Sequence, residues 1–151
     1  MILRFEGLKN RSQKQSLEQF CKKACRLVPA LRGNGELSIL FVTDRRIRQI
    51  NKKFLNHDFA TDVIAFPYSL KGLGGEADPF GDIYVSLDTA AREARKGGYS
   101  ALQELALYCL HGMLHLAGYD DHGPKNREKM FAAQKSIFKR SAPRLAPPDH
   151  R

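Results

Sequence analysis

The chain has 151 residues, 42% of them hydrophobic, and a formal net charge of +9. This length and composition suit one domain with a substantial core and exclude a disordered chain. No apolar run approaches the length of a membrane span, the first residues lack a signal-peptide pattern, and three cysteines suggest no disulfide framework. We therefore expect a cytoplasmic protein with no membrane partner, and we favour a monomer.

From the N-terminus, the pattern alternates between short strands and amphipathic helices. Met1–Phe5 is a short strand, and apolar residues recur at helical spacing over Ser12–Val28, which Ser12 or Ser16 could begin. A Gly-Asn-Gly turn precedes a strand at Glu36–Thr43, and Thr43 or Asp44 then caps a helix from about Arg45 to Phe54.

The second half of the chain continues this alternation. Asp62–Phe66 is an apolar strand that ends at Pro67, a glycine-rich loop covers Ser69–Phe80, and a further strand follows at Gly81–Ser86. A helix is expected over Leu87–Lys96, and the last helix has the apolar stripe Met130, Phe131, Ile137 and Phe138.

This order of elements predicts an α+β fold, a mixed sheet of about four strands flanked by helices with a metzincin-like metal helix. We expect a single domain over residues 1–140, whose last helix is Lys125–Arg140. Residues 141–151 contain three prolines and few anchors, so a flexible C-terminal tail is expected there.

The stretch Ser100–His122 is the centre of the predicted fold. Ser100 and Gln103 match a capping box at the start of a helix. Apolar residues then cover almost every side of that helix, which predicts burial on most sides. Gly118 is placed to end it in the left-handed conformation. Within this apolar helix, His111 and His115 are four residues apart and share one face.

These two histidines predict a metal site. Histidines at this spacing also suit hydrogen bonding inside a core, but the residues that follow favour metal binding. After Gly118 the chain turns and returns Asp121 and His122 over the two histidines. Two helical histidines and one ligand after a turn are typical of metzincin zinc sites, which leave the fourth position open. We expect one Zn²⁺ per chain, held by His111, His115 and either His122 or Asp121.

The residue after the first histidine distinguishes this site from a zinc protease. Gly112 stands where such proteases carry a glutamate general base. Either the base lies elsewhere in the chain or the reaction is not proteolysis. Asp120 is the carboxylate nearest in sequence; capping the turn is its simpler role, and we keep it as the candidate catalytic residue.

Charge is divided between an acidic centre and basic flanks. Residues 54–122 contain four basic and ten acidic residues, whereas 9–32, 44–53 and 123–151 are strongly basic. An acidic centre suits a bound cation, and basic flanks suit a polyanion held around it. Ordinary solvated helix faces would explain the basic flanks equally simply.

Three motifs resemble the YbeY family of bacterial metal-dependent endoribonucleases. They are HGMLHLAGYDDH at His111–His122, TDVIAFP at Thr61–Pro67 and GDIYVS at Gly81–Ser86, and their order and separation also fit. The first motif is highly specific, and the resemblance extends from Met1 to Arg140. It implies a small α+β fold, one zinc, and hydrolysis of single-stranded RNA in 16S rRNA 3′-end maturation and ribosome quality control. The implied partners are ribosomal RNA and ribosome-associated proteins.

The chain departs from this family at two positions. Counted without a gap from His111, the third metal-binding histidine of the family falls on Asp121, and His122 comes one residue later. The residue count favours Asp121, whereas imidazole is the commoner zinc ligand and inclines us to His122. Leu55 stands where the family commonly has an arginine that is thought to help hold RNA. Candidates to supply that charge instead are Arg45, Arg46 and Arg48.

We therefore interpret the chain as a zinc-dependent endoribonuclease. A hydrolase of another substrate, a protease included, is compatible with the metal site, but Gly112 argues against it. A non-catalytic ribosome-associated factor with a structural metal is the third possibility, and Leu55 slightly favours it. If neither Asp121 nor His122 binds the metal, His57 in the loop before Thr61 is a further candidate ligand.

Overall fold

The computed structural model describes residues 1–68 and 79–149. Each predicted strand and helix is present, with boundaries that differ from the expected ones by at most two residues. The predicted loop lies outside the described residues, apart from Pro79 and Phe80, which begin a strand. In chain order the elements are β1 (Ile2–Glu6), α1 (Arg11–Leu27), η1 (Pro29–Leu31), β2 (Glu36–Val42), α2 (Asp44–Leu55), β3 (Val63–Pro67), β4 (Pro79–Ser86), α3 (Leu87–Gly97), α4 (Ala101–Leu116) and α5 (Pro124–Ser141).

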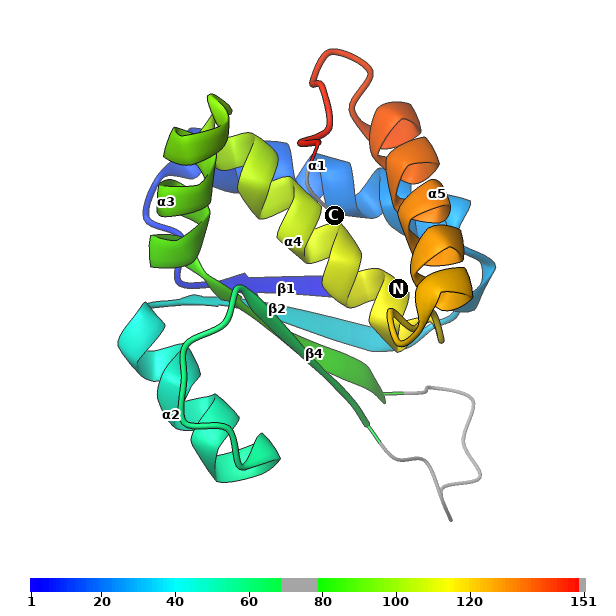
Figure 1. The fold of residues 1–151 in the computed structure, drawn as a ribbon. Helices are drawn as coiled ribbons and strands as arrows, with labels where there is room; N and C mark the ends of the chain where they lie inside the picture. Colours follow the sequence, from blue (N-terminus) through cyan, green and yellow to red (C-terminus); the bar gives the residue numbers. More distant parts are fainter. Residues whose placement is uncertain (69–78, 150–151) are drawn as a thin grey trace.

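The four strands form one mixed sheet in the order β1-β2-β4-β3. β1, β2 and β4 are parallel, whereas β3 pairs with β4 in the antiparallel sense and lies at the edge. Four helices, α1, α3, α4 and α5, cover one side of the sheet, and α2 lies on the other side (Figure 1). This is the α+β architecture that the sequence predicts.

α4 is the central helix of the larger layer, and every residue of it from Glu104 to Leu114 is buried. Its capping box forms as predicted: Ser100 Oγ accepts a hydrogen bond from Gln103 N, and Gln103 Oε1 accepts one from Ser100 N. At its other end Gly118 has a φ of +101°, in the region that favours glycine. α4 also contacts the edge strand β3.

Gly112 lets α4 approach the sheet closely. A Cβ atom at this position would lie 2.7 Å from Cγ2 of Ile83 on β4, a distance that packed side chains do not tolerate. The position after the first histidine is therefore occupied by glycine for a packing reason. It follows that a glutamate there would require either the Ile83 side chain or the helix to shift.

The structure corrects two details of the expected helices. α1 begins one residue before Ser12, and neither Ser12 nor Ser16 caps it, because the side chain of Asn10 accepts a hydrogen bond from Gln13 N. In α5, Phe131 does not belong to the apolar stripe and is exposed. The buried face of α5 runs instead through Met130, Gln134, Ile137, Phe138 and Ser141.

The C-terminal segment has more anchors than its sequence suggests. Gln103 Nε2 donates a hydrogen bond to Ala146 O at 2.8 Å, and Asp149 N donates one to the Tyr99 hydroxyl at 2.8 Å. Pro148 is buried. These contacts hold residues 142–149 beside the N-terminal end of α4, and the flexibility of the tail stays a prediction.

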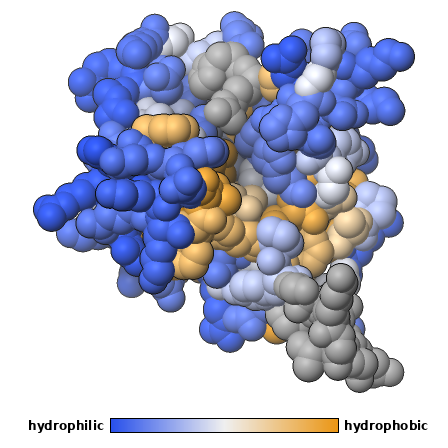
Figure 2. Space-filling model, turned by 60° about the horizontal axis from the view of Figure 1, so that its bottom comes forward, coloured by the Kyte–Doolittle hydropathy of each residue, from blue (hydrophilic) through white to orange (hydrophobic). Residues whose placement is uncertain are grey.

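Hydrophobic side chains gather toward the middle of the face that Figure 2 shows, with hydrophilic residues around them. Across the described residues, none of the helices is both long and apolar enough to cross a membrane.

Three exposed apolar side chains come from the end of α2 and the loop that follows it, and they are Phe54, Leu55 and Phe59.

Candidate metal centre

Three potential ligands converge at the C-terminal end of α4. His111 Nε2 and His115 Nε2 lie 3.0 Å apart on one face of the helix. Asp121 Oδ2 lies 3.7 Å from each of these two nitrogens. The carboxylate reaches them because the chain reverses at Gly118, where Tyr119 N donates a hydrogen bond back to Leu114 O.

The other ring nitrogen of each histidine is engaged elsewhere. His115 Nδ1 lies 3.1 Å from Tyr119 O, and a carbonyl oxygen only accepts, so the hydrogen is on Nδ1. His111 Nδ1 lies 2.9 Å from Oε1 of Gln134, a buried residue of α5, which favours the same tautomer. In these tautomers both Nε2 atoms carry a lone pair and lie 3.7 Å from the Asp121 carboxylate. Three electron-pair donors that face one another repel unless a cation lies between them.

This donor set fits a zinc-like ion. A point equidistant from three atoms at these separations lies about 2.0 Å from each, which is the usual length of a zinc–nitrogen or zinc–oxygen bond. The side chain of His111 is 4% exposed, whereas those of His115 and Asp121 are 30% and 38% exposed. The group could therefore hold a metal ion that is covered by protein on one side and open on the other.

His122 and Asp120 lie outside this group of three. The side chain of His122 is 91% exposed, and its Nε2 lies 3.9 Å from Asp120 Oδ1. The same oxygen accepts a hydrogen bond from His122 N at 2.9 Å, so Asp120 stabilises the turn. The geometry thus favours Asp121 as the third ligand, in agreement with the residue count and against the preference from ligand chemistry.

A cavity of about 500 Å³, which we call the metal-site cavity, opens beside His115. The TDVIAFP segment supplies one wall of it, and the loop after α2 supplies another. His57 lies on this cavity, but among the described residues it belongs to no group of metal-type ligands. The lining residues are Asn51, Leu55, His57, Phe59, Thr61, Val63, Ile64, Ala65, His115 and His122.

The arginines of α2 lie on a neighbouring cavity of about 450 Å³. Arg45 and Arg48 line it, whereas Arg46 does not and instead contacts Gln49. Arg48 Nε is paired with Asp58 at 2.8 Å, and this hydrogen bond lowers the pKa of the Asp58 carboxyl. Two of the three arginines suggested by the sequence are therefore placed near the metal-site cavity.

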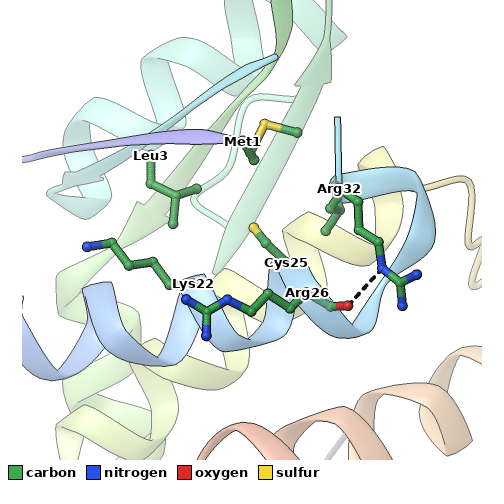
Figure 3. Close-up of a pocket in the computed structure, with 7 residues that line it drawn as sticks. Met1, Leu3, Lys22, Cys25, Arg26 and Arg32 are labelled. Carbon is green, nitrogen blue, oxygen red and sulfur yellow. Dashed lines mark hydrogen bonds between the residues drawn. The ribbon is translucent and has the colours of Figure 1, made fainter. Parts of the chain in front are cut away.

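A separate basic cavity of about 320 Å³ lies between α1, η1 and β1 (Figure 3). Lys22, Arg26 and Arg32 line it, and Arg32 Nε donates a hydrogen bond to Arg26 O at 2.9 Å. Cys25 also lines it, and burial raises the pKa of its thiol to about 12. A neutral thiol is a poor metal ligand, so Cys25 behaves as a small apolar residue.

Comparison with known proteins identifies the family. The family model described as Endoribonuclease YbeY matches residues 5–142. The chain belongs to the YbeY family. Endoribonuclease YbeY of Elusimicrobium minutum is 50% identical over 96 residues, which are 64% of this chain and 67% of that protein.

Other relatives agree with this family assignment. Endoribonuclease YbeY of Anaeromyxobacter dehalogenans is 48% identical over 66% of this chain, which aligns with only half of that relative's length. The same enzyme of Chlorobium phaeovibrioides is 41% identical over 82% of this chain and 81% of its own. The solution structure of TM1509 from Thermotoga maritima matches with a TM-score of 0.66 and 25% identity, over 99% of this chain and 100% of that one.

Two buried polar residues that the sequence patterns did not indicate support the site and its cavity. Gln134 contacts His111 from α5, and Asn51 holds the loop that lines the metal-site cavity. Both are polar residues on the mostly apolar buried face of an amphipathic helix. A polar residue in such a position needs a partner, and that was the available signal.

Proposed function

We propose that this chain is a zinc-dependent endoribonuclease that cleaves single-stranded RNA. The observation that carries the proposal is the convergence of His111, His115 and Asp121 beside an open cavity, in a member of the YbeY family. Two imidazoles and one carboxylate suit zinc, and three protein ligands leave a position for water or substrate. Relatives that carry the name endoribonuclease supply the substrate class.

Each residue of the site has a distinct task in this proposal. His111, His115 and Asp121 would hold the metal, while Gln134 and the carbonyl of Tyr119 fix the orientation of the two imidazole rings. When bound, zinc supplies Lewis-acid chemistry, which activates water and neutralises charge on a phosphoryl group. Asp120 is proposed as the group that moves protons; its Oδ1 is engaged by the turn.

Two observations disfavour the other candidate functions. A protease of the related architecture needs a carboxylate after the first histidine, but this position is Gly112, where a Cβ atom would clash with Ile83 at 2.7 Å. A purely structural zinc is enclosed by four protein ligands, whereas this group has three, and the side chains of His115 and Asp121 reach solvent.

One experiment separates these functions. The purified protein is incubated with single-stranded RNA, structured RNA and casein, each with and without a chelator. We expect cleavage of the single-stranded RNA, its loss with chelator, its return when zinc is added, and intact casein. A His111→Ala, His115→Ala variant should be inactive. RNA cleavage that survives both the chelator and this double substitution would contradict the proposal.

The cellular substrate that we propose is the 3′ end of 16S rRNA, with ribosome-associated proteins as partners and the cytoplasm as location. This part rests on family membership and on no feature of the described residues. Sequencing of 16S rRNA 3′ ends from cells that lack the protein provides the test. We expect 3′-extended precursors, which the wild-type chain should remove and the double histidine variant should not.

A further inference from the structure

The loop between α2 and β3 places two stacked aromatic rings on the metal-site cavity. The ring centroids of His57 and Phe59 are 5.3 Å apart, with an angle of 12° between the planes. Both residues line the cavity on which His115 also lies. Phe59 is 56% exposed, so more than half of its surface faces solvent. A large aromatic ring held at the surface beside a candidate active site suggests a binding role.

The backbone of this loop is fixed at both rings by one buried residue. Asn51 Nδ2 donates a hydrogen bond to Phe59 O at 3.0 Å, and Asn51 O accepts one from His57 N at 3.2 Å. Between the rings, Asp58 pairs with Arg48 at 2.8 Å. The rings are therefore positioned before a ligand arrives, which reduces the entropy cost of binding.

Phe59 also lies between two cavities of different character. It lines the cavity that contains His115 and the neighbouring cavity that contains Arg45 and Arg48. Arg48 is paired with Asp58, whereas Arg45 has no carboxylate partner within the described residues. Bases alternate with phosphates along a nucleotide strand. A strand could therefore place a base on the ring of Phe59 and a phosphate near Arg45, with the candidate metal ligands on the other side of the ring.

We infer that His57 and Phe59 form a stacking platform for one nucleobase of single-stranded RNA, and that Arg45 contacts a neighbouring phosphate. This inference rests on the proposed nuclease function and assigns the position of the strand in that site. Stacking tolerates all four bases, so the platform would favour unpaired RNA without selecting a sequence. Duplex RNA would not fit, because its bases already stack on one another.

The test compares two exposed phenylalanines of the same segment. Phe54 is 61% exposed and lines neither of these two cavities, so Phe54→Ala is the matched control for Phe59→Ala. The probe is a short single-stranded RNA that contains 2-aminopurine, whose fluorescence falls when the base stacks. Binding to the metal-loaded protein is recorded by rapid mixing before cleavage proceeds, and circular dichroism checks the fold of each variant.

We expect the wild-type protein to quench the probe and Phe59→Ala to weaken binding by about 5- to 150-fold, the loss expected for one stacked base. Phe59→Tyr, which keeps a ring, should restore binding, and Phe54→Ala should stay within about twofold of the wild type. Arg45→Gln should lower the slope of log affinity against log salt by about one.

The outcomes distinguish this inference from the function on which it rests. If the wild-type protein cleaves RNA, and Phe59→Ala binds and quenches the probe as strongly as the wild type, the platform is overturned. The nuclease function is unaffected by that result. A wild-type protein that neither binds nor cleaves the RNA would overturn both. Equal losses in Phe54→Ala and Phe59→Ala would also overturn it, because a general effect on the segment would then explain the result.

Discussion

Asp44 and Asp121 both belong to polar clusters, and the two clusters differ in what surrounds the carboxylate. Asp44 Oδ1 accepts hydrogen bonds from the hydroxyls of Ser86 and Thr89, at 2.6 and 2.7 Å, and its Oδ2 accepts one from Arg92 at 2.7 Å. Asp121 instead faces two imidazole nitrogens, 3.7 Å away, in rings that carry their hydrogens on the opposite side.

The difference separates a cluster whose polar groups satisfy one another from a cluster that could hold a cation. Around Asp44, donors and acceptors match: burial alone would raise the pKa of its carboxyl, but hydrogen bonds from Ser86, Arg92 and Thr89 lower it below the ordinary value. These hydrogen bonds connect the first residue of α2 to Thr89 and Arg92 of α3. Around Asp121, acceptors face acceptors, and the arrangement becomes favourable only with a cation.

Removal of the Asp121 carboxylate should produce the largest effect, a loss of zinc affinity well beyond 100-fold in Asp121→Ala. A ligand bond is lost, whereas changes beside the ligands typically cost about 10- to 100-fold. His122→Ala is the matched control and should lose less, because its side chain is exposed and outside the group. Competition with a chelating dye measures both. Equal, small losses in the two variants would exclude both residues as ligands.

Loss of the partner of His111 should have the next largest effect. Gln134→Leu removes the acceptor for His111 Nδ1, so we expect a fall of about 10- to 100-fold in zinc affinity. Gln134→Glu keeps an acceptor oxygen in place and should bind zinc at least as tightly as the wild type. Unchanged zinc affinity in Gln134→Leu would mean that packing alone orients the imidazole ring of His111.

Asp44→Ala should show the opposite profile, with lower stability and unchanged zinc affinity. Three donors lose their acceptor, so we expect the free energy of unfolding to fall by about 2 kcal/mol at pH 7. Because the pKa of Asp44 is lower in the folded state, the stability due to its charge is complete above the unfolded-state pKa of about 3.9.

That contribution is lost as the pH falls through the folded-state pKa of Asp44. The difference between wild type and Asp44→Ala, measured by urea unfolding, should therefore be constant from pH 7 to about 5 and shrink below about 4. A difference that stays constant down to pH 3 would assign the effect to neutral hydrogen bonds alone. A change in zinc affinity would show that the two clusters are coupled.

The sequence predicted most elements, and the proximity of His111 to His115, because those signals are local. The capping box at Ser100 and the spacing of His111 and His115 depend only on helix geometry. The candidate for a third ligand was harder to choose, since Asp121 and His122 differ by one residue in a turn whose direction depends on the backbone at Gly118. In the structure Asp121 is the one that approaches both histidines, with its Oδ2 3.7 Å from each Nε2.

Contacts between distant segments could not be predicted in the same way. Gln134 contacts His111 from α5, which begins after the turn that contains Asp121. The spacing of the two histidines contains no information about how α5 packs against α4. The predicted capping residue of α1 was also wrong. Asn10 and Ser12 are both good capping residues, and the choice between them depends on where β1 ends.

The smallest predicted effect is a gain. Leu55 is exposed and lines the cavity that contains His115. Of the arginines nearby, Arg48 is already paired with Asp58, much as Arg92 is paired with Asp44. A guanidinium at position 55 would be free to contact phosphate, so Leu55→Arg should bind single-stranded RNA several-fold more tightly and raise the salt slope by about one.

Leu55→Gln is the control for this variant, because it adds polarity without charge and should leave the salt slope unchanged. Fluorescence anisotropy with labelled single-stranded RNA at several salt concentrations measures both variants. If Leu55→Arg tightens binding and steepens the salt dependence, the cavity beside His115 follows the path of the phosphate backbone. If the two variants behave alike, RNA does not pass Leu55, and the charge on α2 provides the phosphate contacts through Arg45.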